Sequence, residues 1–261
     1  MGETTDGREF MPNIPGNPGS ARIVPLGDSA AVVILGDSIS LQIHYRVRAL
    51  CSYLEHHPFT GMAELVPSFT SIAVYYDGLA VLKAYPGYIR PGGEYYPFPV
   101  VAALLEMMLS HIDDEPPPQP RTVRIPVYYG GEAGPDLEFV AEHNGLLPQQ
   151  VIDIHSSAEY LVYMLGFAPG FPYLGGLPSS ISTPRRLSPR VAIPAGSVGI
   201  AGDQTGVYPL ETPGGWQLIG RMPLSLFKPE SVPPTLLQAG DTVRFYPISR
   251  REFMEWGEDL P

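Results

Sequence analysis

Apolar positions in the first half of the chain follow two different periods. Residues with a spacing of three or four predict two helices, at Ser38–Glu55, which ends before Pro58, and at Val100–His111. Short β-branched runs bounded by turn residues predict four strands, namely Arg22–Leu26, Ala30–Leu35, Glu64–Pro67 and Ser71–Tyr76. The order ββαββα is typical of an α+β domain, in which helices cover one face of an antiparallel sheet. We assign residues 21–112 to this domain.

The pattern changes in the second half. A strand is predicted at Val123–Tyr128, followed by short helices at Leu137–His143 and Leu147–His155, and Asp136 is expected to cap the first helix with its carboxylate. Short apolar runs split by glycine and proline then follow, at Tyr160–Leu165, Val191–Pro194, Val198–Ile200, Gln217–Gly220 and Thr242–Tyr246. Short strands at such spacing predict a sandwich or a barrel. We assign residues 121–250 to this mainly β domain.

Three segments lie outside these domains. Residues 1–20 have no apolar run of the kind found in signal peptides, and we expect a flexible leader. Residues 113–120 read DDEPPPQP, a composition that predicts a stiff, solvated linker. Residues 251–261 are expected to form a tail of frayed helix or coil.

Composition and charge narrow the classes of partner. The 28 glycines and 31 prolines favour many short strands joined by turns, and the formal net charge of −11 makes nucleic acid and anionic membranes unsuitable partners. No run approaches the roughly 18 apolar residues that cross a bilayer. The single cysteine, Cys51, cannot form an internal disulfide, which fits a reducing cytoplasm, and its apolar helical setting predicts a buried, inert thiol.

Several kinds of catalytic site are missing from the sequence. There is no phosphate-binding loop of the GxxxxGK[ST] type, no GxSxG nucleophile elbow, and no metal-binding spacing among the six histidines. We therefore expect the chain to bind no metal and no cofactor by itself. His155 is predicted to be a structural histidine rather than a general base.

An unusual loop combines aromatic residues with glycine and proline. The stretch from Tyr160 to Pro178 reads YLVYMLGFAPGFPYLGGLP. Proline fixes the φ angle and glycine allows φ angles that other residues avoid, so this composition suits a loop of defined shape that presents ring faces to a substrate or partner. The candidate binding residues are Phe167, Pro169, Gly170, Phe171 and Tyr173. The alternative is that these rings only plug a barrel end.

Two further stretches complete the candidate site. Arg185, Arg186 and Arg190 lie within six residues, and their guanidinium groups suit a carboxylate or phosphate, or else pair with acids of the chain. The remaining candidates could supply hydrogen-bond donors and an aromatic wall to a ligand, or they could only shape the corners of a barrel. They are Gly196, Ser197, Gly199, Gly214, Gly215 and Trp216.

Four motifs together resemble the allophanate hydrolase subunit 1 family. They are GFAPGFPYLGGLP, PRRLSPRVAIPAGSVGIAG, QTGVYPLETPGGWQLIGR and AGDTVRF. Looser matches are the Gly27-Asp28 pair, VPSF at Val66–Phe69 and GPDL at Gly134–Leu137. The resemblance covers about residues 20 to 250. It implies a cyclophilin-like β-barrel behind a small α+β domain, and an active site shared with a partner of the subunit 2 type.

The resemblance also implies a function and leaves two alternatives open. Members of this family act in ATP-dependent 5-oxoprolinases, which open the ring of 5-oxoproline, a small carboxylate, to give glutamate. This chain would then serve as their B subunit, working with partners of the A and C type, and the assembled complex would use the ATP. Other members inhibit a sensor histidine kinase, or form part of the carboxyltransferase region of urea carboxylase.

Overall fold

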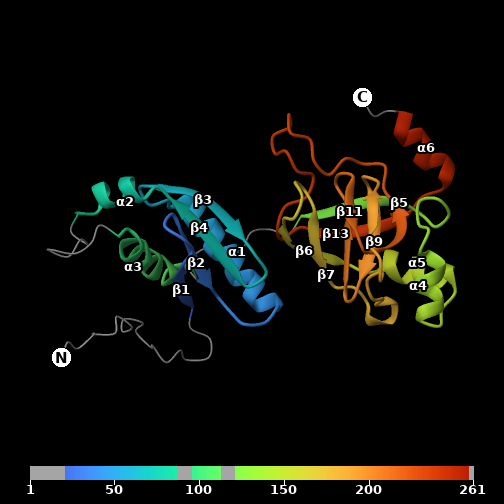
Figure 1. Cartoon of the computed structure of the whole chain (residues 1–261), viewed down its shortest axis with the longest axis horizontal. Helices are drawn as coiled ribbons and strands as arrows, with labels where there is room; N and C mark the ends of the chain where they lie inside the picture. Colours follow the sequence, from blue (N-terminus) through green and yellow to red (C-terminus); the bar gives the residue numbers. More distant parts are fainter. Residues whose placement is uncertain (1–20, 87–95, 113–120, 259–261) are drawn as a thin grey trace, which may run out of the picture. The chain divides into compact units, whose positions relative to one another are not determined.

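The computed structural model describes residues 21–86, 96–112 and 121–258, and the chain divides into two compact units, residues 1–115 and 116–261 (Figure 1). The predicted leader, residues 1–20, and the predicted linker, residues 113–120, lie outside the described residues. Among the described helices, none is both long enough and apolar enough to cross a membrane.

The first unit contains an antiparallel sheet with the strand order β1-β2-β4-β3. Its elements are β1 (Arg22–Pro25), β2 (Ala30–Ile34), α1 (Leu41–His56), β3 (Met62–Pro67), β4 (Ser71–Tyr76), α2 (Gly78–Ala84) and α3 (Phe98–Leu109). Alternate residues of β2 and β4, such as Val33 and Val74, share one buried cluster with Leu50 of α1 and Leu105 of α3. Because alternate strand residues point to the same face, α1 and α3 cover one face of the sheet.

Helix α2 was missed by the sequence analysis, which predicts no element at residues 78–84. Asp77-Gly78 is the start of this helix, because the Asp77 carboxylate accepts hydrogen bonds from the backbone N–H groups of Leu79 and Ala80. An aspartate in this position is a common N-cap, so the signal was present in the sequence.

Helix α1 also buries the single thiol. Cys51 is 9% exposed, and burial raises its pKa to about 12. The thiolate is therefore not formed near neutral pH, which confirms the prediction of an inert, buried cysteine.

The second unit is a closed barrel whose described strands follow the order β10-β7-β6-β13-β5-β12-β9. They are β5 (Thr122–Tyr129), β6 (Tyr160–Leu165), β7 (Pro172–Gly175), β9 (Ser197–Ala201), β10 (Gln204–Val207), β12 (Gln217–Arg221) and β13 (Thr242–Pro247). β5 and β13 pair in parallel, and the other barrel pairs are antiparallel. A separate two-stranded antiparallel ribbon is formed by β8 (Arg190–Ile193) and β11 (Thr212–Gly214).

The barrel confirms the coarser fold prediction for the second unit. The cyclophilin-like topology that the resemblance implies stays a prediction. Strands β7, β10 and β11 were not predicted, because they are three or four residues long and contain glycine, so they carry little apolar periodicity.

Three helices and a short 3₁₀ turn complete this unit. They are α4 (Leu137–His143), α5 (Pro148–Ser157), the 3₁₀ turn η3 (Ser179–Ile181) and α6 (Arg250–Glu258). Helix α6 replaces the expected frayed tail over its described residues. The side chains of Ser249 and Glu252 each bond to the other residue's backbone N–H, which forms a capping box.

His155 of α5 is held inside the barrel and is fully buried. Its Nδ1 lies 2.8 Å from the Tyr129 hydroxyl and its Nε2 lies 3.0 Å from the Thr205 hydroxyl. Thr205 donates its own proton to the carbonyl of Gly199, so His155 donates from Nε2 and accepts at Nδ1. Burial lowers the pKa of His155 to about 3. These bonds confirm that His155 is structural.

Candidate functional site

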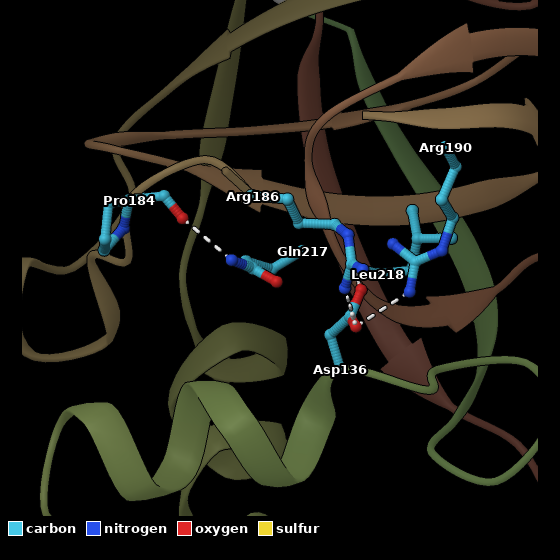
Figure 2. Close-up of polar contacts among 6 residues, drawn as sticks. All are labelled: Asp136, Pro184, Arg186, Arg190, Gln217 and Leu218. Carbon is cyan, nitrogen blue, oxygen red and sulfur yellow. Dashed lines mark hydrogen bonds and ion pairs between the residues drawn. The ribbon is translucent and has the colours of Figure 1, made fainter. Parts of the chain in front are cut away.

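A buried carboxylate joins two of the three predicted arginines. Asp136 is 5% exposed, and its Oδ1 accepts hydrogen bonds from Nη1 of Arg186 at 3.0 Å and Nη2 of Arg190 at 2.8 Å. Figure 2 shows both guanidinium groups converging on this one oxygen. The arginines come from β8 and the loop before it, whereas Asp136 precedes α4, some fifty residues earlier in the chain.

The backbone of β12 fixes the position of Asp136. The N–H of Asp136 donates to the carbonyl of Leu218 at 2.9 Å, and Oδ2 of Asp136 accepts from the Leu218 N–H at 2.7 Å. Gly134 permits this approach, since a Cβ there would lie 2.1 Å from the carbonyl oxygen of Ile219. The prediction that Asp136 caps α4 with its carboxylate is therefore wrong, because that carboxylate is committed to β12 and the arginines.

The cluster carries a net positive charge and has unused donors. Two guanidinium groups face one carboxylate, which leaves one positive charge uncompensated within the trio. Nε of Arg186 and Nη1 of Arg190 are buried and have no hydrogen-bond partner among the described residues. A buried donor without a partner costs about 1–3 kcal/mol, so a ligand that supplies acceptors would recover this energy. We expect that ligand to be an anion.

The loop before β8, which contains Pro184 and Arg186, is hydrogen-bonded to Gly215 and to Gln217 at the start of β12. The backbone N–H of Arg186 donates to the carbonyl of Gly215 at 2.8 Å, and Nε2 of the buried Gln217 donates to the carbonyl of Pro184 at 2.9 Å. Figure 2 shows the Gln217 bond beside the arginine cluster. Arg185 is exposed and stands outside the Asp136 network. Two of the three arginines thus act together, and the loop that carries them is anchored.

Four aromatic rings surround Phe171. The ring centroids of Phe167, Tyr173, Tyr208 and Trp216 lie 5.3 to 5.7 Å from that of Phe171, each in an edge-to-face arrangement. Phe171 is 3% exposed and Trp216 is 6% exposed. These two rings form an apolar core rather than a free wall, so Phe171 cannot be the surface anchor for a partner.

Phe167 is the exposed member of this aromatic group. Its φ angle is +68° and its side chain is 70% exposed. A left-handed conformation is unfavourable for an aromatic residue and commonly marks functional positions. Pro169 is also exposed, whereas Gly170 is buried, with a φ of +81° that suits glycine. The loop therefore turns Phe167 outward, as a candidate contact.

Tyr208 links the aromatic group to the arginines. Burial raises the pKa of Tyr208, while a hydrogen bond from the Trp216 backbone and the charges of Arg185 and Arg190 act in the opposite direction. Gly214 leaves room for the hydroxyl, because a Cβ there would lie 2.5 Å from it. Tyr208 was missed by the sequence analysis, although it lies in one of the quoted motifs.

The predicted donors near β9 are not free. The N–H of Gly196 donates to the carbonyl of Tyr208, and both the N–H and the hydroxyl of Ser197 donate to the carbonyl of Pro194. Gly199 is buried in β9, between β10 and β12, so its backbone belongs to the barrel. These three residues therefore shape the barrel corner, while Gly215 accepts the bond from Arg186 through its carbonyl.

Comparisons with known proteins agree on the family. Residues 21–237 match the family described as carboxyltransferase domain, subdomain C and D. The chain is 52% identical to the 5-oxoprolinase B subunit of Bacillus subtilis, over 91% of this chain and 97% of that protein. It is 43% identical to the 5-oxoprolinase B subunit of Escherichia coli O157:H7, over 87% of this chain and 96% of that protein.

A solved structure shares the fold of this chain. The crystal structure of TTHA0988 matches with a TM-score of 0.69 and 33% identity, and the match covers 84% of this chain but 40% of that longer one. The protein described here belongs to the family of carboxyltransferase domains with subdomains C and D.

Proposed function

We propose that the chain is the B subunit of an ATP-dependent 5-oxoprolinase and that the Asp136–Arg186–Arg190 cluster binds the carboxylate of 5-oxoproline. The observation that carries this proposal is the pair of buried, unpartnered guanidinium donors beside a single carboxylate. The identity to two relatives named as the B subunit of 5-oxoprolinase supports it.

The residues of the candidate site are suited to binding and orienting 5-oxoproline rather than to breaking its lactam bond. Arg186 and Arg190 would hold the carboxylate, and Phe167 and Tyr173, which are not fully buried, would contact the ring. Opening a lactam also needs proton transfer, and His155 is excluded as a general base because both of its ring nitrogens are bonded inside the barrel. The catalytic base and the handling of ATP would therefore come from partner proteins.

The partners we propose are a C-type protein, related to allophanate hydrolase subunit 2, and an A-type protein, both in the cytoplasm. The names of the two relatives support the need for partners, since both are described as one subunit of 5-oxoprolinase. The direct experiment is to purify the chain together with the two partner proteins and to measure the formation of glutamate from 5-oxoproline and ATP. A complex that forms but shows no turnover would contradict the proposal.

Arg186→Lys is expected to lower the turnover of the assembled enzyme by about tenfold to a hundredfold. Lysine keeps the charge beside Asp136 but loses the planar fork and the unpartnered Nε donor. We expect the melting temperature to change little, because the ammonium group still compensates the carboxylate. Arg244→Lys is the matched control, since Arg244 forms an exposed ion pair with Glu159 elsewhere on the barrel. Equal activities in both variants would remove Arg186 from the site.

Phe167→Asn is expected to weaken the complex with the C-type partner by about 1–3 kcal/mol. Asparagine tolerates the left-handed conformation, so the loop is retained while the exposed ring is lost. Binding is measured by calorimetry with purified proteins. Phe139→Gln serves as the control, because Phe139 is an exposed aromatic residue on α4. If the two variants bind equally well, Phe167 makes no contact with that partner.

A further inference from the structure

A concave groove lies on the barrel unit, between the turn before β9, the end of β12 and helix α6. Its volume is about 420 Å³, which is within the usual range for small-molecule sites. Gly196 contributes bare backbone to its wall, since a Cβ there would lie 2.4 Å from the carbonyl oxygen of Met222. Pro209, Pro223 and Leu224 supply much of the apolar lining.

Helix α6 forms one side of this groove. Phe253 packs its ring 5.7 Å from that of Tyr128, and Arg250 forms an ion pair with Glu132 at 3.0 Å. Met254 lines the groove and yet is 58% exposed, so the side chain is not packed into the barrel. The helix is therefore anchored on the barrel beside a space that the side chains of the described residues do not fill.

Arg221 is the one charged residue in the lining as far as the structure describes the chain. Its Nε donates to the carbonyl of Ala195 at 2.8 Å, which fixes the guanidinium group against the turn before β9. Among residues 21–86, 96–112 and 121–258, no Asp or Glu lines the groove and no carboxylate pairs with Arg221. In a chain with a net charge of −11, a guanidinium group in an apolar groove without an acidic partner is unusual.

We propose that this groove binds a small carboxylate with an apolar body. The terminal nitrogens of Arg221 match the two oxygens of a carboxylate, and the proline, leucine and methionine side chains match an aliphatic or cyclic body. The hydroxyl of Ser225 already donates to the carbonyl of Phe227, so it can accept a hydrogen bond but is not a free donor. The site uses none of the residues of the Asp136 cluster and does not depend on the proposed activity.

The test uses hexanoate and its uncharged analogue hexanamide with the full chain alone. Hexanoate is expected to bind at least about tenfold more tightly than hexanamide, because only the carboxylate engages the charge of Arg221. Calorimetry gives the affinities. The methyl resonance of Met254 locates the ligand in the unaltered protein, so the result does not depend on a variant that folds poorly.

Variants inside and outside the groove then test whether hexanoate binds at Arg221 or at another arginine of the surface. Arg221→Gln is expected to weaken hexanoate binding about tenfold or more. Arg251→Gln, on α6 but outside the groove, and Arg244→Gln, in an exposed ion pair elsewhere on the barrel, are expected to bind as the unaltered chain does. Equal binding of hexanoate and hexanamide, an unmoved Met254 resonance, or unchanged binding in Arg221→Gln would overturn the proposal.

Discussion

Asp136→Ala is expected to reduce the free energy of unfolding of the barrel unit by about 3 kcal/mol. The change removes the acceptor for Arg186 and Arg190 and leaves the buried N–H of Leu218 without its partner. Breaking a buried ion pair costs about 3–5 kcal/mol, and the lower end applies because the arginine side chains are 36% and 23% exposed.

Urea denaturation, monitored by tryptophan fluorescence, measures the free energy of unfolding of the barrel unit. Both tryptophans, Trp216 and Trp256, lie in the second unit. Glu132→Ala is the matched control: it also removes a carboxylate from an arginine, but the Glu132–Arg250 pair is exposed and is expected to contribute at most about 1 kcal/mol. Similar losses in both variants would mean that the Asp136 cluster does not stabilise the barrel.

The barrel unit is also expected to lose stability as the pH falls below about 6.5, because of His155. Burial lowers its pKa to about 3, whereas in the unfolded chain it takes up a proton near its ordinary value of 6.5. Protonation in the fold would also deprive the Tyr129 hydroxyl of its acceptor. The stabilisation is therefore complete above pH 6.5 and is lost progressively as the pH falls towards 3.

The expected loss between pH 6.5 and about pH 5 is roughly 1.5–2 kcal/mol, since each pKa unit corresponds to about 1.4 kcal/mol. His155→Gln should unfold more easily at neutral pH but show a weaker dependence on pH over this range. His44, whose pKa is lowered to about 4, lies in the first unit, where no tryptophan reports on it. Parallel pH profiles for the unaltered chain and His155→Gln would contradict the assignment.

Much of the fold could be predicted because most elements carry a clear period. Ser71–Tyr76, Leu137–His143 and Tyr160–Leu165 were predicted with the observed bounds. The missed elements fall into two groups. Strands such as β10 are too short to show alternation, whereas α2 and α6 are short helices whose polar caps, Asp77 and the Ser249–Glu252 box, were the readable signals.

Arg186 and Arg190 were predicted, together with Arg185, either to bind an anion or to pair with acids of the chain, but the acid, Asp136, was not identified. No acidic residue lies between Glu159 and Asp203, so sequence proximity gave no candidate for the counter-ion. Asp136 reaches the arginines because Gly134 lets the loop lie against β12, and this depends on tertiary packing. The same limit applies to Phe171 and Trp216, since an aromatic residue in a glycine-rich loop can face either the core or the solvent.

The parallel pairing of β5 with β13 has a consequence for how the protein is made. β5 opens the barrel unit, yet it pairs along Thr122–Val127 with Thr242–Pro247, about 120 residues later. During translation the barrel cannot close until β13 has left the ribosome, so β5 and β6 each keep an unpaired edge until then. Nascent chains that stall before Thr242 would expose these edges, and they are the species that we expect chaperones to bind.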